Sequence, residues 1–320
     1  MSAQPIALSV IACTRNRAAQ LVGMLKSLAE CSQPRHWGYE LIVVDNGSTD
    51  STKAVVEQAR SASPCAVRYV TEMRKGLSHA RNTGWLNARG ELVAFVDDDV
   101  RVDAQWLHRV REAFSGPGQV DGLVGRVLPF ESAPQELLVG MKFEADRQTF
   151  RFPCRISIGH GCNMAFPRNV IAKIGVFDPR LDPGAPLHAA GDTDFIYRLL
   201  KQGGTVVYEP SVLVFHQPRA DSAEAWRSHY RNAKGFAGFL MIHGIWGDGY
   251  ALKNLYWFAQ DTWKRYWWAR RAGEEVVRKT KAMYLRGLAA GMAHGAVLGL
   301  TPPRGAATGS VARFLPEAGR

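Results

Sequence analysis

The chain has 320 residues, of which 46% are hydrophobic and 22% charged, and its formal net charge is +11. This composition is typical of a soluble globular protein, and the absence of any run of about 18 apolar residues argues against a transmembrane helix. Five scattered cysteines without a C-x-x-C spacing exclude a cysteine zinc site and a disulfide framework, which favours a reducing compartment. With no signal peptide visible, we expect a cytoplasmic protein.

The first hundred residues alternate between strand and helix patterns. Apolar runs predict strands at 7–12, 41–44, 66–70 and 92–96. Helical patterns lie between them, namely Leu21 to Leu28, a segment through Val55 and Val56 that Ser48 or Thr49 is expected to cap, and 77–88. Such alternation predicts an α/β fold with a mainly parallel sheet and helices on both faces.

The second part of the chain is less regular. Short strands and loops rich in Gly and Pro begin near residue 119, followed by a predicted helix at 192–202 and predicted strands at 206–208 and 212–215. After Asp221 the pattern is helical and aromatic up to Pro302-Pro303. We therefore expect a helical extension over 221–303 and a flexible tail over 304–320.

Three carboxylates, Asp97, Asp98 and Asp99, directly follow the apolar run 92–96. Open α/β sheets bind ligands outside the carboxyl ends of their strands. Like charges this close repel by about 4 kcal/mol per pair at an effective dielectric of about 20, so a compensating divalent metal is expected. If the extended geometry continues, Asp97 and Asp99 share a face and Asp98 points away. The alternative is an acidic turn in which Asp99 caps the next helix.

Two other predicted strands also end in polar turns. The first is followed by Thr14-Arg15-Asn16-Arg17 and the second by Asp45-Asn46-Gly47-Ser48-Thr49-Asp50. Their polar groups should meet at the edge of the sheet that carries the aspartates. Arg17 suits a phosphate, and Asp45 suits a base or ribose edge, although Asn-Gly-Ser is also simply a good turn.

Taken in order, four motifs resemble those of the family 2 glycosyltransferases with the GT-A fold: Thr14-x-Asn16-Arg17, Val43 to Asp50, Gly76 to Asn82, and Phe95 to Asp99. The resemblance covers about residues 6–235. It implies an inverting enzyme that uses a nucleotide-sugar donor, usually a UDP-sugar, with Mg²⁺ or Mn²⁺. It also implies a catalytic domain over 1–220, with a nucleotide-sugar-binding half over about 1–118 and an acceptor-binding half over about 119–220.

The resemblance assigns roles to these residues. Thr14 and Arg17 would line the nucleotide site, Asp45 would contact the base, and Arg81 would steady the site near the phosphates. Asp97 and Asp99 would form the D-x-D pair that contacts ribose and metal, with Asp98 also in the nucleotide-sugar site. Independently, a metal held by carboxylates would neutralise the charge that develops on a departing diphosphate.

Inversion in one displacement also requires a base that takes the proton of the acceptor hydroxyl. The segment Gly191-Asp192-Thr193-Asp194 resembles the Glu-Asp-x-Asp segment of the family, whose second acid is the expected base. That acid is Asp192 here, with Asp194 as the alternative, and Gly191 stands where Glu is common. Both carboxylates also suit the first turn of a helix.

Two further residues follow from the resemblance. His216 comes after the apolar run 212–215, like a family histidine that approaches the metal or diphosphate in some relatives, although a lone His is more often structural. The segment Gly159 to Met164 resembles the small-residue segment before the acceptor loop, which implies that Asn163 borders the sugar.

Aromatic and basic residues are interleaved in the region 246–286. Nine basic and three acidic residues lie between Lys253 and Arg286, together with a group of tryptophans. Rings and cations suit an anionic bilayer surface, which would place the protein at the inner face of the plasma membrane with a lipid-linked acceptor. The alternative is an amphipathic helical hairpin packed on the catalytic domain with solvated cations.

We thus expect a glycosyltransferase acting on a saccharide or lipid-linked acceptor in surface polysaccharide or glycolipid synthesis. A sugar-nucleotide nucleotidyltransferase is an alternative, but Cys13 to Arg17 lacks the glycines of its phosphate loop. An inactive relative that only binds nucleotide sugars is another. No nucleic-acid partner is expected, because the basic excess lies outside the α/β part and no binding motif is present.

Overall fold

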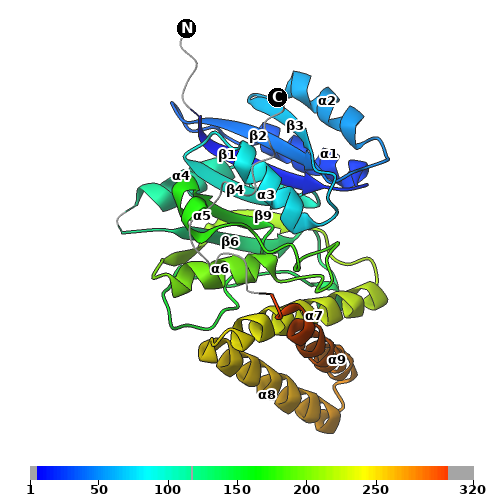
Figure 1. Cartoon of the computed structure of the whole chain (residues 1–320). Coiled ribbons are helices and arrows are strands. Elements are labelled where there is room, and N and C mark those ends of the chain that lie inside the picture. The colour runs from blue at the N-terminus through cyan, green and yellow to red at the C-terminus, as the bar shows by residue number, and fades with distance from the viewer. Residues whose placement is uncertain (1–5, 117, 302–320) are drawn as a thin grey trace.

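The computed structural model describes residues 6–116 and 118–301, so the predicted tail at 304–320 and Pro302-Pro303 lie outside the described residues. One β-sheet is flanked by helices on both faces, and three long helices follow at one end of the molecule (Figure 1). The sheet has the order β3-β2-β1-β4-β8-β6-β9-β5, with β7 paired to β9. The expected α/β fold with a helical extension is confirmed.

The first four strands are parallel and are β1 (Ile6–Thr14), β2 (Gly38–Asp45), β3 (Ala66–Thr71) and β4 (Leu92–Asp97). They are joined by α1 (Ala18–Glu30), α2 (Thr52–Ala62) and α3 (Leu77–Asn87). In this register Thr14 pairs with Asp45, and Cys13 pairs with Asp97. The polar turns after these strands therefore lie at the same edge of the sheet.

The predicted cap of the second helix is wrong. α2 begins at Thr52 rather than beside Ser48 or Thr49, and the carboxylate of Asp50 accepts hydrogen bonds from the backbone N–H and the hydroxyl of Thr52. Ser48 instead accepts a hydrogen bond from the backbone N–H of Asn16 at 2.9 Å. Ser48 thus ties the turn after β2 to the turn after β1.

The second half of the sheet is mixed, because β8 (Asn163–Pro167) runs antiparallel to both β4 and β6 (Gly122–Pro129). The two strands predicted at 206–208 and 212–215 form one strand, β9 (Val206–His216), parallel to β6. β9 also pairs with β5 (Val100–Val102), which sets His216 opposite Val100. The remaining elements are β7 (Gln148–Phe150), α4 (Trp106–Ser115), η1 (Gln135–Leu137), α5 (Arg168–Ile174) and α6 (Gly191–Lys201).

Two apolar clusters, one on each face of the sheet, form the core. On one face the strands pack against α1 and α4, represented by Leu21 and Trp106. On the other they pack against α3, α5 and α6, where Phe177 stacks on Phe195. Because the sheet is buried on both faces, its parallel strands are nearly continuous apolar runs.

The helical extension consists of α7 (Ser222–Ile245), α8 (Gly249–Ala272) and α9 (Glu275–Leu298). α9 packs closely along α7, since Cβ atoms built at Gly287, Gly291 and Gly295 would lie 2.4, 2.3 and 2.6 Å from backbone oxygens of α7. α8 lies farthest from the sheet (Figure 1). None of the described helices combines the length and the hydropathy that a bilayer-spanning segment needs.

Candidate active site

The three aspartates at the end of β4 face two different environments, although the strand ends at Asp97 and the next two residues form a turn. Asp98 is buried and accepts hydrogen bonds from the Thr14 hydroxyl and from Arg17, both at 2.7 Å. Arg17 also donates to Oδ2 of Asp99 at 3.0 Å. Asp98 therefore fastens the turn after β1 to the turn after β4, while Asp97 and Asp99 turn toward His216.

Asp97, Asp99 and His216 form a cluster in which one potential ligand atom of each lies within 4.8 Å of the others. Nδ1 of His216 lies 2.8 Å from the Gln217 carbonyl, and Nε2 lies 3.4 Å from Oδ1 of Asp99. That buried oxygen has no hydrogen-bond partner among the described residues. Two carboxylates and one imidazole, one of whose carboxylate neighbours has an oxygen without a hydrogen bond, are a ligand set that suits a divalent metal ion.

Burial opposes the ionisation of all three carboxyl groups, and neighbouring positive charges outweigh it only at Asp99. It raises the pKa of Asp97 against the attraction of Arg81, and it raises the pKa of Asp98 to about 6 although Arg17 opposes it. Burial also opposes ionisation of Asp99, but His216 and Arg17 outweigh it and hold the pKa of Asp99 below its ordinary value. Desolvated carboxylates compensated from several sides are frequent at functional sites.

A crevice of about 490 Å³ opens beside this cluster. Its walls include residues from the turns after β1 and β4, among them Thr14, Arg17, Asp97, Asp98, Asp99 and His216. α7 supplies another wall through Glu224, Ser228, Arg231 and Asn232, which recur at helical spacing. Sequence reasoning missed this wall, because the first half of α7 also carries Arg227, His229 and Lys234, so this polar row does not stand out.

A larger hollow of about 660 Å³ is lined by Trp85, Glu91, Leu92 and Arg168. It lies at the end of the sheet where β4 begins, opposite the aspartates at the end of β4. Ligands of open α/β sheets bind at the carboxyl ends of the strands, so we place the candidate site in the smaller crevice.

Asp45 and Arg81 lie near the crevice in different ways. Asp45 is buried at the end of β2, where its carboxylate accepts hydrogen bonds from the Ser48 backbone N–H and the Tyr69 hydroxyl. Each carboxylate oxygen keeps a further lone pair for a ligand. The guanidinium of Arg81 is buried, with Nη2 lying 3.8 Å from Oδ1 of Asp97.

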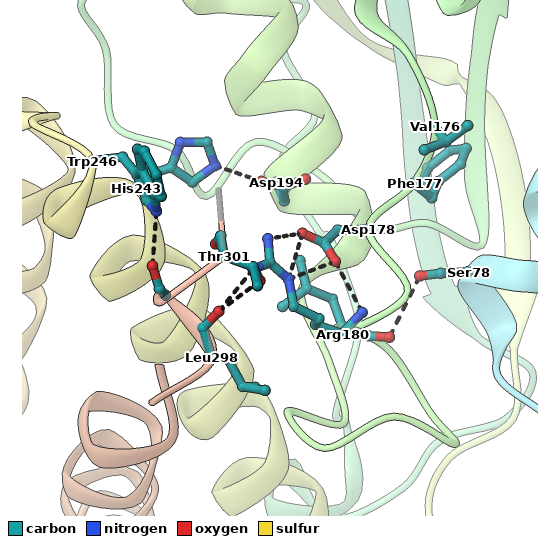
Figure 2. A network of polar contacts seen from close by, with 12 residues as sticks. Ser78, Val176, Phe177, Asp178, Arg180, Asp194, His243, Trp246, Leu298 and Thr301 are labelled. Atoms are coloured by element: carbon teal, nitrogen blue, oxygen red, sulfur yellow. Dashed lines mark hydrogen bonds and ion pairs between the residues drawn. The ribbon is translucent and has the colours of Figure 1, made fainter. Parts of the chain in front are cut away.

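The two candidate bases on α6 have different partners. Asp192 is partly exposed, and its Oδ2 accepts a hydrogen bond from the Gly161 backbone N–H at 2.5 Å. Asp194 is buried and pairs with Arg198 at 2.9 Å and with His243 of α7 at 2.7 Å. Figure 2 shows the latter contact within the network that joins α6 to the helical extension. The carboxylate of Asp194 is therefore enclosed by structural partners, whereas that of Asp192 is not.

The structure places Asn163, predicted to border the sugar, in the core. Its side chain is buried, its amide oxygen accepts a hydrogen bond from the indole of Trp106 at 3.0 Å, and its amide nitrogen donates to the carbonyls of Arg126 and Val212. The core uses both amide hydrogens and one lone pair of the amide oxygen. Asn163 thus joins β8, β6 and β9 and is not carried into the proposed site.

Asp182 was missed by the sequence analysis. It lies in the Gly- and Pro-rich loop before α6, is buried, and accepts hydrogen bonds from Ser78, Arg81 and the backbone N–H of Gly191. Burial raises the pKa of this carboxyl, and the attraction of Arg81 opposes the increase. No periodicity marks an isolated acid in an irregular loop, so the sequence offered no signal.

Comparison with known proteins identifies the family. Residues 9–175 match the model described as glycosyl transferase family 2. The chain belongs to this family. It is 30% identical over 241 residues to the succinoglycan biosynthesis protein ExoM of Rhizobium meliloti, covering 73% of this chain and 75% of the relative. It is 27% identical over 291 residues to glycosyltransferase AglE of Haloferax volcanii, covering 87% and 89%.

Solved structures of glycosyltransferases share the GT-A fold of this family 2 chain. The mannosyltransferase PcManGT of Pyrobaculum calidifontis, in complex with GDP-Man and Mn²⁺, has a TM-score of 0.59 at 18% identity, covering 92% of this chain and 86% of that one. The fragment 1–349 of S. aureus TarS, in complex with UDP-GlcNAc, has a TM-score of 0.54 at 17% identity, covering 89% and 91%. The family 2 chain is therefore a transferase enzyme with a GT-A catalytic fold.

Proposed function

We propose that this glycosyltransferase moves a sugar, with inversion, from a nucleoside-diphosphate donor to an acceptor hydroxyl in the crevice beside Asp97, Asp99 and His216. The observation that carries the proposal is the buried Oδ1 of Asp99, which has no hydrogen-bond partner in the described part of the chain and faces Nε2 of His216 next to the crevice. A divalent metal bound there, Mg²⁺ or Mn²⁺, would neutralise charge on the departing diphosphate.

The residues around this cluster have complementary roles in the proposal. Thr14 and Arg17 both donate hydrogen bonds to Asp98, and these bonds hold the Arg17 guanidinium in the wall of the crevice. In the proposal, Arg17 binds a phosphate of the donor there. Asp45, at the end of β2, receives the base or ribose edge of the nucleotide. The buried guanidinium of Arg81, whose Nη2 lies 3.8 Å from Oδ1 of Asp97, stabilises the Asp97 carboxylate.

Asp192 is the proposed general base. It is the partly exposed acid of α6, and the Gly161 N–H fixes the direction of its carboxylate. A base so oriented accepts the proton of the acceptor hydroxyl as the new bond forms on the face opposite the leaving diphosphate. One carboxylate is sufficient for this single displacement.

The donor is proposed to be a UDP-sugar, in keeping with the family resemblance and with the UDP-GlcNAc complex of the TarS fragment. The GDP-Man complex of PcManGT makes a GDP-sugar the competing donor. The likeness to a succinoglycan biosynthesis protein supports a saccharide or lipid-linked acceptor in surface polysaccharide or glycolipid assembly. The nucleotidyltransferase alternative is set aside, because the chain belongs to a glycosyltransferase family.

We also propose that the extension contacts an anionic membrane through the outer face of α8, defined as Lys253, Tyr256, Trp257, Gln260, Lys264, Trp267, Trp268 and Arg271. These residues follow one another at helical spacing, opposite the buried Ala251, Leu255, Thr262 and Ala269. Trp257 and Trp268 are 38% and 60% exposed. Exposed rings flanking a row of cations suit the headgroup region of a bilayer.

The activity is tested by incubating the purified chain with UDP-Glc, UDP-Gal, UDP-GlcNAc and GDP-Man, each with Mn²⁺ or with EDTA. Release of nucleoside diphosphate reports donor cleavage even before the acceptor is known, and NMR of a transfer product reports its anomeric configuration. We expect metal-dependent cleavage of one donor and an inverted product. Cleavage of none of these donors, or a product with retained configuration, would contradict the proposal.

A further inference from the structure

The guanidinium of Arg81 is buried among acidic groups that belong to three different parts of the chain. Its Nη1 lies 2.9 Å from Oδ2 of Asp182, and its Nη2 lies 3.8 Å from Oδ1 of Asp97. A Cβ built at Gly161 would lie 2.4 Å from Nη2 of Arg81 and 2.9 Å from Oδ2 of Asp192. Arg81 therefore lies between the proposed metal ligands and the proposed base, and Asp182 makes its shortest ion pair.

The carboxylate of Asp182 also holds the beginning of α6. Its Oδ1 accepts a hydrogen bond from the Gly191 backbone N–H at 2.7 Å, and its Oδ2 accepts one from the Ser78 hydroxyl at 3.0 Å. Asp182 has a left-handed backbone conformation with φ of +71°. One side chain from an irregular loop thus connects α3, which carries Arg81, to the residue that precedes Asp192.

The position of this carboxylate explains why residue 191 is a glycine. A Cβ built at Gly191 would lie 2.2 Å from Oδ2 and 2.6 Å from Cγ of Asp182. Any side chain at 191 would therefore begin in the volume that the Asp182 carboxylate already fills. The family segment that 191–194 resembles commonly carries Glu at this position, whereas in this chain the acid at this place is Asp182.

We propose that Asp182 is a positioning residue that supplies, from the neighbouring loop, the carboxylate that position 191 lacks. It compensates the charge of Arg81 and fixes Arg81 and the first turn of α6 relative to each other. In this way it sets the spacing between the metal-binding cluster and Asp192. The inference rests on the proposed function, because the spacing matters only if both groups act on one substrate.

An exchange of the acid between the two positions tests the proposal. The variants are Asp182→Gly, which suits the positive φ, Gly191→Glu, and the double variant. Each single change is expected to lower kcat about tenfold to a hundredfold while the donor KM changes less, as is usual when a supporting residue is lost. The double variant is expected to recover most of the lost kcat. A double variant no better than the poorer single one would overturn the proposal, as would normal kcat in Asp182→Gly.

Two controls keep the result interpretable. Asp146→Gly makes the same change at an exposed loop position and should leave kcat unchanged. The number of nucleoside diphosphate molecules bound per chain shows whether a low kcat reflects unfolded protein. Asp182→Asn should behave like Asp182→Gly, because the amide of the asparagine would place an N–H donor against either the Gly191 N–H or Arg81. Wild-type activity in Asp182→Asn would count against the role of the negative charge.

The thermal unfolding of the same proteins separates this inference from the proposed function. If the wild type cleaves no donor, the proposed function fails, but the exchange is still measured by melting temperature. Each single variant should then melt below the wild type, and the double variant should melt above the less stable single one. If the decreases in melting temperature of the two single variants add up in the double variant, the side chains at 182 and 191 do not occupy the same space. That result overturns the inference even without an activity assay.

Discussion

Asp192 and Asp194 lie two residues apart on α6 but are held by different parts of the protein. Asp192 accepts a hydrogen bond from the backbone of Gly161 and is partly exposed, whereas Asp194 is enclosed by Arg198 and His243. Arg198 and His243 also hold the pKa of Asp194 below its ordinary value, against the effect of burial. The two acids should therefore respond differently to the same substitution.

We expect Asp192→Asn to lower turnover by about a hundredfold or more, the scale of a lost general base, while nucleotide affinity stays at the wild-type level. Asp194→Asn is the matched control, and it should chiefly lower the free energy of unfolding, because Arg198 loses its buried partner. Steady-state kinetics and urea denaturation of both variants check this. Near-normal turnover in Asp192→Asn would place the base elsewhere.

Arg180 joins the loop before α6 to the end of α9. Its guanidinium pairs with the buried Asp178 and donates hydrogen bonds of 2.9 Å to the carbonyls of Leu298 and Thr301 (Figure 2). Arg180→Ala should lower the free energy of unfolding by about 2–4 kcal/mol, because a buried carboxylate and two carbonyls lose their partner.

Urea denaturation measures the effect of Arg180→Ala. The control is Arg109→Ala, which breaks an exposed pair with Glu112 on α4 and should cost about 0–1 kcal/mol. Equal losses in the two variants would mean that the contact between Arg180 and α9 contributes little to stability.

The half-buried His229 of α7 makes stability depend on pH. Burial, with repulsion from Lys281 and Arg219, lowers the pKa of His229 to about 4. The unfolded chain takes up this proton already below about pH 6.5, so it binds more protons than the folded chain between these two pH values. Stability should fall as the pH decreases from about 6.5 to about 4.

His229→Phe keeps the ring beside Tyr284 and removes the titration. Between pH 7.5 and pH 5 the wild type should lose about 1 kcal/mol more than this variant, allowing for partial exposure of the imidazole. Urea denaturation at both pH values checks this difference. A parallel loss in both proteins would show that other groups dominate this pH range.

Membrane contact is tested on the outer face of α8. The triple variant Lys253→Gln, Lys264→Gln, Arg271→Gln should bind vesicles containing phosphatidylserine at least tenfold more weakly than the wild type. The reason is that each cation near an anionic surface contributes about 1 kcal/mol to the binding free energy. Co-sedimentation at low salt measures this. The triple variant Lys26→Gln, Arg60→Gln, Arg109→Gln removes equal charge from exposed positions on α1, α2 and α4 and is the control. Absence of wild-type binding would end the membrane proposal.

The sequence predicted features that depend on local spacing. The apolar runs located the parallel strands. Asp98 is separated from Asp97 and Asp99 as expected, but in a turn and not through the alternation of an extended strand. The contact of His216 with Asp99 could not be derived from spacing, because it depends on the pairing of β9 with β5 more than a hundred residues earlier in the chain. It was reached only through the family resemblance.

Other parts of the site depended on distant packing. Asn163 occupies a segment that resembles the family, but its amide is used by three elements of the core. Asp182 acts through an irregular loop, and only the structure shows that its carboxylate fills the space beside Gly191. The wall of the crevice on α7 could not be predicted, because the sequence does not show that the extension folds back beside the sheet.

The most direct measurement for the central claim is calorimetric titration of UDP and GDP into the chain with Mn²⁺ and with EDTA, for the wild type and Asp99→Asn. Glu57→Gln, at an exposed pair on α2, serves as the control. We predict that one nucleotide binds at least tenfold more tightly with Mn²⁺ and that Asp99→Asn alone abolishes this difference. Nucleotide binding that is equally tight in EDTA, or a metal effect that persists in Asp99→Asn, would contradict the account.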